Sequence, residues 1–128
     1  MTFLSRLTEP SYALLRIVSG AIFTFHGVQK IFGILTDHQP PVGSQLWLGG
    51  MIELICGILI VVGYQTRFAA FLSSGTMAVA YFQFHWKFRF GPEFFPAING
   101  GDAAILYCFV FLYIACRGSG IWAFQKSG

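Results

Sequence analysis

Residues 46–63 read LWLGGMIELICGILIVVG, an apolar run interrupted by one charged residue, Glu53. The run is near the length of about 20 residues that an α-helix needs to cross a membrane. An ionised side chain at that depth costs about 3 kcal/mol unless it is paired or hydrated. Glu53 therefore predicts a helix bundle with a polar interior, and it marks a candidate functional site.

Three further apolar segments could also span a membrane. They are residues 12–35, 67–86 and 102–117, and polar or glycine-containing connections separate them. Together with residues 46–63 they predict an all-α fold, an integral membrane four-helix transmembrane bundle with up-down topology. At this length the chain is expected to form a single domain over residues 1–128.

The composition supports a membrane protein. Of the 128 residues, 55% are hydrophobic and only 10% are charged, whereas a soluble domain carries about 25% charged residues. So few charges could hardly cover a soluble surface, and membrane lipid is therefore an expected partner. The net charge of +3 is scattered without a basic cluster, which argues against nucleic acid as a partner.

Basic residues favour one orientation of the predicted bundle. Four of them lie on the side that holds both termini, namely Arg6, Arg67, Arg117 and Lys126. Three lie on the other side, namely Lys30, Lys87 and Arg89. Because cytoplasmic loops are enriched in lysine and arginine, this distribution favours cytoplasmic termini. Arg16 is expected to snorkel or to find a partner near the same inner surface.

Charged residues of different spans are expected at similar depths. At 1.5 Å per residue, Lys30 lies roughly 7 Å and His26 roughly 14 Å below the outer end of the first span. Glu53 lies roughly 10 Å below the outer end of the second span. His85 ends the third span and Asp102 begins the fourth near the same boundary. Five ionisable residues from four helices are therefore predicted to share one cavity that opens outward.

Helical periodicity predicts which face of each span turns inward. At about 100° per residue, Glu53 shares a stripe with Gly49, Gly50 and Gly57, and glycines let helices approach closely in lipid. The stripe of the fourth span that is predicted to face the cavity contains Asp102, Leu106, Phe109, Tyr113 and Cys116.

Three motifs, in order along the chain, resemble the DoxX family. They are LLRIVSGAIFTFHGVQKIFG (14–33), GGMIELICGILIVVGYQTRFAA (49–70) and NGGDAAILY (99–107). The first contains an H-G-x-x-K element that ends in Lys30, and the second contains a G-x-x-E-x-x-x-G element around Glu53. Asp102 departs from the family pattern, which commonly has glutamate after N-G-G.

The resemblance implies a small bacterial integral membrane protein with four helices. It therefore implies a multi-pass protein of the bacterial cytoplasmic (inner) membrane. The family includes members linked to thiosulfate:quinone oxidoreduction and others tied to membrane-associated redox or thiol-stress complexes. A membrane subunit of a redox system is the function that the resemblance implies.

The predicted site combines a carboxylate, an imidazole and an amine. Glu53, His26 and Lys30 are the predicted catalytic residues, because these groups can exchange protons with a quinone head group as it is reduced. The predicted substrate-binding residues are His85, Tyr81, Asn99 and Asp102. The aromatic residues expected to wall the pocket are Phe23, Tyr81, Phe84 and Phe109.

No tightly bound cofactor and no metal ion is predicted. The chain has no phosphate loop, dinucleotide fingerprint or c-type haem motif, and its histidines and cysteines lack paired metal-ligand spacing. Quinone would itself be the carrier, and a soluble redox partner protein is expected to supply the rest of the reaction. A second copy of the chain is another expected partner, because one small bundle leaves little interior volume.

Other interpretations stay open at this point. The charged residues could form a purely structural network that holds the helices together. The chain could then be a non-catalytic membrane anchor or assembly partner for a soluble redox enzyme. A small transporter or ion pathway is a further alternative, although the inner half is apolar apart from Arg16. Asp102 could stabilise the start of its helix without a role in catalysis.

Overall fold

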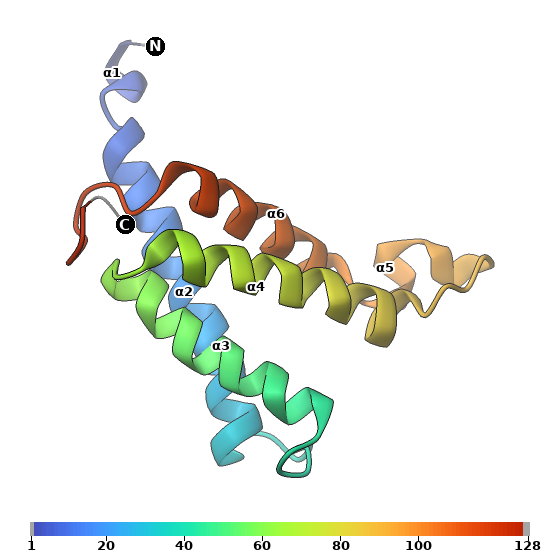
Figure 1. Ribbon diagram of the computed structural model, residues 1–128. Coiled ribbons are helices and arrows are strands. Elements are labelled where there is room, and N and C mark those ends of the chain that lie inside the picture. The colour runs from blue at the N-terminus through green and yellow to red at the C-terminus, as the bar shows by residue number, and fades with distance from the viewer. Residues whose placement is uncertain (1, 127–128) are drawn as a thin grey trace.

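The structure, a computed structural model, describes residues 2–126 (Figure 1). Every regular element in this part of the chain is helical, and it contains no strand. The long helices are α2 (Thr8–Phe32), α3 (Gln45–Val62), α4 (Thr66–Ala80) and α6 (Asp102–Arg117). The short elements are α1 (Thr2–Ser5), the π-helix η1 (Tyr81–Trp86), the 3-10 helix η2 (Pro92–Phe94) and α5 (Pro96–Asn99). The predicted all-α class is confirmed.

The predicted apolar segments coincide with the long helices. Segment 67–86 corresponds to α4 and η1 together, because Tyr81 keeps right-handed helical backbone angles and the helix continues without a break. Gly33 (φ 66°) and Gly63 (φ 77°) end α2 and α3 in the left-handed conformation that favours glycine at this position.

α2 and α3 form an antiparallel hairpin held closely together by glycines. A Cβ atom at Gly27 would lie 2.7 Å from the Cα of Leu54, and one at Gly57 would lie 2.8 Å from the nitrogen of Thr24. Both distances are too short for real atoms, so only glycine permits this approach of the two backbones. Small residues at the contact are typical of helix pairs in membranes.

α4 and α6 form a second antiparallel hairpin, and here one prediction is wrong. The hydroxyl of Ser74 donates to the carbonyl of Cys108 at 2.7 Å, which turns Phe111 and Ile114 into the interior, where both are fully buried. The stripe predicted to face inward lies on the opposite side and is exposed. It comprises Asp102, Leu106, Phe109, Tyr113 and Cys116.

The two hairpins meet at one end through residues 118–126, which we call the C-terminal segment. The N–H of Phe124 donates to the carbonyl of Val62 at 2.8 Å, and the N–H of Gln125 donates to that of Gly63 at 2.9 Å. Figure 1 shows the two hairpins diverging from this end of the molecule. The fold is therefore tightly packed around the turn between α3 and α4 and more open at the far end.

Arg16 lies at the centre of this packed end and is fully buried. Its guanidinium donates to the carbonyls of Ile60 (3.1 Å), Ile121 (2.9 Å) and Trp122 (2.6 Å), and also to that of Ser119. Between residues 2 and 126, no carboxylate pairs with it. Of the two expectations for Arg16, snorkelling is wrong and a partner near this end is confirmed. The carbonyl of Ile60 in the last turn of α3 and three carbonyls that follow α6 replace water around its charge.

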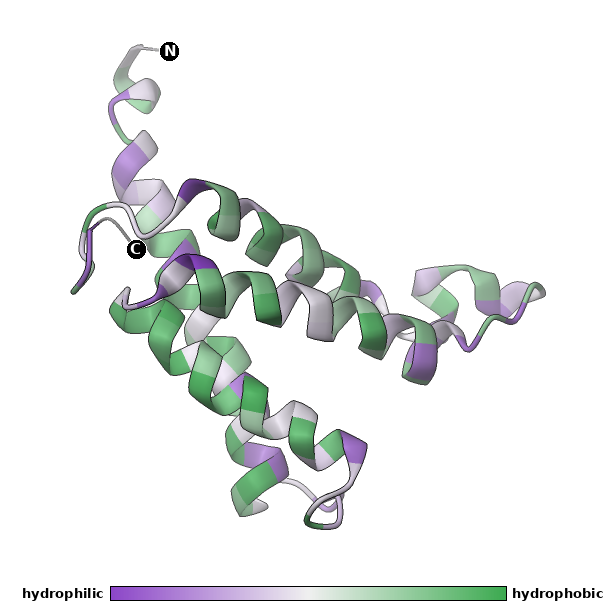
Figure 2. Cartoon of the chain, in the orientation of Figure 1, coloured by the Kyte–Doolittle hydropathy of each residue, from purple (hydrophilic) through white to green (hydrophobic). Residues whose placement is uncertain are grey.

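The long helices consist largely of apolar residues, as Figure 2 shows, and many of their large apolar side chains are exposed. Of the helices described, α2 and α3 are long and apolar enough to cross a membrane. Only 39% of the apolar window of α2 and 28% of that of α3 is buried inside the protein. Most of each window therefore lies on the surface, unlike the core helix of a soluble domain. α4 and α6 are shorter, with 15 and 16 residues.

Candidate functional site

An ion pair joins α2 to α3 in the half of the hairpin away from the packed end. The Nζ atom of Lys30 lies 2.8 Å from Oε1 of Glu53, and Glu53 is only 3% exposed. Gly50 makes room for this arrangement, because a Cβ there would lie 2.6 Å from the Cβ of Lys30. A side chain at position 50 would therefore displace Lys30, so Gly50 allows the lysine to reach the carboxylate of Glu53.

The second carboxylate oxygen of Glu53 has no partner. Oε2 is buried and accepts no hydrogen bond from any described part of the chain. A buried acceptor without a donor is rare in folded proteins and is unfavourable by about 1–3 kcal/mol. Among the described residues, Oε2 of Glu53 is therefore the buried side-chain oxygen that has no hydrogen-bond donor.

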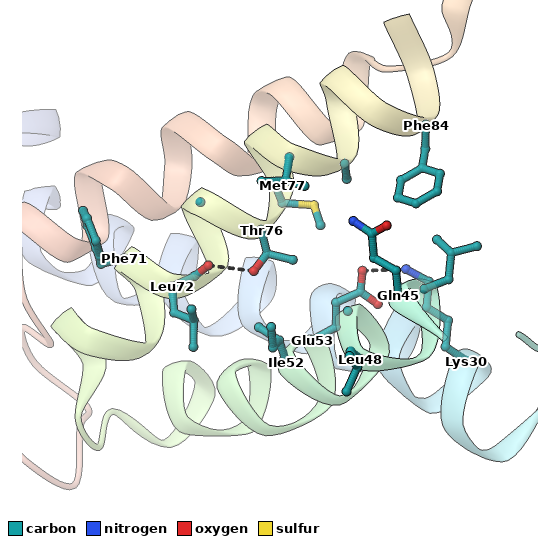
Figure 3. Close-up of a pocket in the computed structure, with 15 residues that line it drawn as sticks. Lys30, Gln45, Leu48, Ile52, Glu53, Phe71, Leu72, Thr76, Met77 and Phe84 are labelled. Carbon is teal, nitrogen blue, oxygen red and sulfur yellow. Dashed lines mark hydrogen bonds and ion pairs between the residues drawn. The ribbon is translucent and has the colours of Figure 1, made fainter. Parts of the chain in front are cut away.

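Glu53 and Lys30 line a groove of about 460 Å³ between α3 and α4 (Figure 3). They are the charged residues of its lining. The remaining wall is largely apolar, with Leu48 and Ile52 from α3 and Met77 from α4, and Phe84 from η1 closes one end. A mainly apolar groove of this size with a few polar groups at one place has the form of a small-molecule site.

A contact between α3 and η1 bridges the groove at the end that lies away from the packed end. The side-chain amide of Gln45, which lines the groove, donates to the side-chain oxygen of Gln83. Both helices otherwise diverge in this direction, so the two glutamines connect elements that are not packed together. The sequence prediction missed both residues, and the only available signal was the position of Gln45 beside the start of residues 46–63.

Lys30 also borders a second hollow, beside the loop that connects α2 to α3. A second space of about 360 Å³ is lined by Lys30 together with Asp37, His38 and Gln39 of the loop that connects α2 to α3. The Lys30 side chain is 30% exposed. Lys30 therefore borders both the apolar groove and the polar loop, whereas Glu53 borders only the groove.

The third predicted catalytic residue, His26, stands apart from this pair. Its side chain is exposed on α2, and its ring lies edge-on to that of Tyr107 from α6, with 6.3 Å between the ring centroids. It does not line the groove between α3 and α4. The structure therefore brings Lys30 and Glu53 into contact and places His26 against a different helix.

The four predicted substrate-binding residues belong to the other hairpin. Asn99 donates to the hydroxyl of Tyr81 at 3.2 Å and accepts from the N–H of Gly101 at 2.8 Å, which ties the start of α6 to η1. His85 is partly exposed on η1, and Asp102 is exposed at the first position of α6. None of the four lines the groove.

The predicted aromatic wall is distributed in the same way. Phe84 lines the groove, whereas Phe23 is buried in the core beside Phe111 and Tyr107. Phe109 is 64% exposed on the outer face of α6. A single cavity shared by all the predicted residues is therefore absent from the described part of the chain, because the hairpins diverge where these residues lie.

A family model described as DoxX matches residues 11–86, more than half of the chain. The chain belongs to the DoxX family. The DoxX match contains Lys30, Glu53 and every other residue that lines the groove between α3 and α4. DoxX membership, together with the two apolar helices, indicates a membrane protein.

The chain is also similar to a protein of Haemophilus influenzae (strain ATCC 51907 / DSM 11121 / KW20 / Rd) named "Uncharacterized protein". It is 41% identical over 118 residues, which cover 89% of this chain and 87% of the relative. No solved structure matches the chain.

Proposed function

We propose that this DoxX protein binds a quinone or a similar lipophilic small molecule in the groove between α3 and α4, as the membrane subunit of a redox system. The observation that carries the proposal is the Lys30–Glu53 pair in the wall of an otherwise apolar groove. An apolar wall suits a ring and its hydrocarbon tail, and a charged pair suits the oxygens of a head group.

The ion pair has unused hydrogen-bonding capacity for such a head group. An ammonium group has three N–H donors, and Lys30 uses one of them on Glu53. The remaining donors can bind a carbonyl oxygen of the ligand. Glu53 keeps Lys30 in place for this contact, and its own free oxygen can accept a hydrogen bond or a proton from the ligand.

Electron transfer would need a second protein. The sequence has no signature of a tightly bound redox cofactor, so the quinone is the proposed carrier. A soluble redox enzyme on the membrane surface is the proposed source of electrons, and a second copy of the chain is a further proposed partner.

The proposed arrangement in the membrane has four crossings in the bacterial inner membrane, with both termini in the cytoplasm. α2, α3, α4 with η1, and α6 would be the crossings, and the connection from α2 to α3 would lie outside. The apolar surfaces of these helices and the distribution of lysine and arginine support this arrangement.

Labelling with a membrane-impermeant maleimide tests this topology. In a chain whose three native cysteines are replaced by alanine, His38→Cys is expected to react in intact cells, because it lies in the outer connection. Gln65→Cys, in the turn between α3 and α4, is expected to react only after the cells are opened. Reaction of both cysteines from the same side would contradict the proposed crossings.

Ligand binding to the purified protein tests the function itself. We expect saturable binding of a short-chain benzoquinone to the detergent-solubilised protein, measured by equilibrium dialysis. Glu53→Gln is expected to weaken that binding by about tenfold or more, because loss of the carboxylate frees Lys30 from its position beside the groove.

Glu93→Gln is the matched control, because Glu93 is a carboxylate outside the groove. It is expected to bind like the wild type, and thermal unfolding of each variant checks that the fold is intact. Absence of saturable binding to the wild type would overturn the proposal and favour a non-catalytic membrane anchor.

A further inference from the structure

The unpartnered Oε2 atom of Glu53 restricts which ligand the groove can accept. Glu53 is 3% exposed, so bulk solvent has little access to this carboxylate. The hydroxyl of Thr76, which lines the same groove, donates to the carbonyl of Leu72 at 2.8 Å. The carboxylate therefore lacks a donor that a bound molecule can provide.

We propose that the groove selects a ligand that donates a hydrogen bond, so that a hydroquinone binds more tightly than the corresponding quinone. This inference rests on the proposed function, and it adds the chemical form of the ligand. A quinone has carbonyl acceptors only, which can pair with Lys30 but leave Oε2 of Glu53 unpartnered. A hydroquinone has hydroxyl groups that both donate and accept, so one hydroxyl can satisfy both residues.

The geometry of the pair supports this selection. Because Nζ of Lys30 lies 2.8 Å from Oε1 of Glu53, its free donors and the free oxygen of the carboxylate lie side by side. Figure 3 shows the carboxylate extending from α3 towards Lys30 and the space between α3 and α4. A hydroxyl oxygen placed there can accept from Lys30 while its hydrogen points to Oε2.

Oε2 must become accessible when such a ligand enters. Lys30 and Gln45 are the flexible polar side chains of the lining near Glu53, and Lys30 is already 30% exposed. The proposed contact requires a side chain of the lining, such as Gln45, to rotate away from the carboxylate while Lys30 keeps its bond to Oε1. The selection therefore depends on side-chain chemistry and not on a change of fold.

Affinity for three matched ligands tests the inference. The dissociation constants of a short-chain benzoquinone, its hydroquinone and the hydroquinone dimethyl ether are measured without oxygen by equilibrium dialysis on the purified protein. We expect the hydroquinone to bind about tenfold more tightly than the quinone, because the free energy that corresponds to a tenfold ratio lies within the range by which an unsatisfied buried acceptor is unfavourable. The dimethyl ether, which has the shape but no donor, is expected to bind no better than the quinone.

The outcomes separate this inference from the proposed function. If no quinone-like ligand binds, the proposed function fails. If quinone and hydroquinone bind equally, or the quinone binds more tightly, the selection fails while the binding site stands. In Glu53→Gln the ratio between the two ligands is expected to fall below about threefold, because a neutral amide is a weaker acceptor than a carboxylate. In Glu93→Gln the ratio is expected to stay at the wild-type value.

Discussion

Replacement of Arg16 by methionine is expected to lower the free energy of unfolding by about 3 kcal/mol or more. Methionine fills much of the space but donates no hydrogen bond, so the carbonyls of Ile60, Ser119, Ile121 and Trp122 lose their donor. Each buried carbonyl without a partner is unfavourable by about 1–3 kcal/mol where water cannot reach it. Chemical unfolding of the purified protein in mixed micelles measures the change.

Arg6→Met is the matched control, because Arg6 is an exposed arginine outside the packed end. Its stability is expected to stay within about 0.5 kcal/mol of the wild type. Hydrogen exchange gives a second measurement, since the C-terminal segment is expected to lose protection in Arg16→Met and to keep it in Arg6→Met. Equal stability of the two variants would show that Arg16 does not hold the segment in place.

The second large effect is expected from a single methyl group in the hairpin of α2 and α3. Gly57→Ala is expected to destabilise the protein by about 2–3 kcal/mol, because the new Cβ would meet the backbone of Thr24, which cannot move away without separating the helices. The same separation would pull Lys30 away from Glu53. We therefore expect Gly57→Ala to reduce ligand binding as well as thermal stability.

Gly49→Ala is the control on the same helix. A Cβ atom at Gly49 has no neighbour within 4 Å, and alanine is favoured over glycine inside a helix by about 0.5–1 kcal/mol. The Gly49 variant is therefore expected to be as stable as the wild type or slightly more stable. A similar loss in both variants would contradict this explanation, because helix propensity favours alanine at both positions and only Gly57 contacts α2.

The helices were predictable because apolar runs and their glycine ends are properties of the local sequence. Residues 102–117 match α6 in full, and the ion pair of Lys30 with Glu53 joins two residues that had similar predicted depths. The shared cavity was not predictable in this way. Depth along each helix assumes that all helices run side by side, whereas the hairpins diverge and leave His85 and Asp102 outside the groove.

The environment of Arg16 could not be predicted either, for a different physical reason. Its partners are backbone carbonyls, which every residue has, so no side-chain pattern identifies them. The inward face of α6 was mispredicted because the stripe that contains the ionisable residue was assumed to face a cavity. In the structure, residues of this stripe such as Asp102 and Tyr113 are exposed. Packing against α4 favours Phe111 and Ile114 instead, and this depends on contacts between distant parts of the chain.

The position of Arg16 also bears on the order in which the protein can be made. Three of its four carbonyl partners follow it by 103 to 106 residues. At a synthesis rate of about 5–20 residues per second, these partners emerge roughly 5–20 s after the arginine. During that interval the first long helix holds a charge whose final partners do not yet exist. Completion of the fold must therefore wait until residues 119–122 have been made, and a chain stopped before them would leave the ribosome with this arginine still unsatisfied.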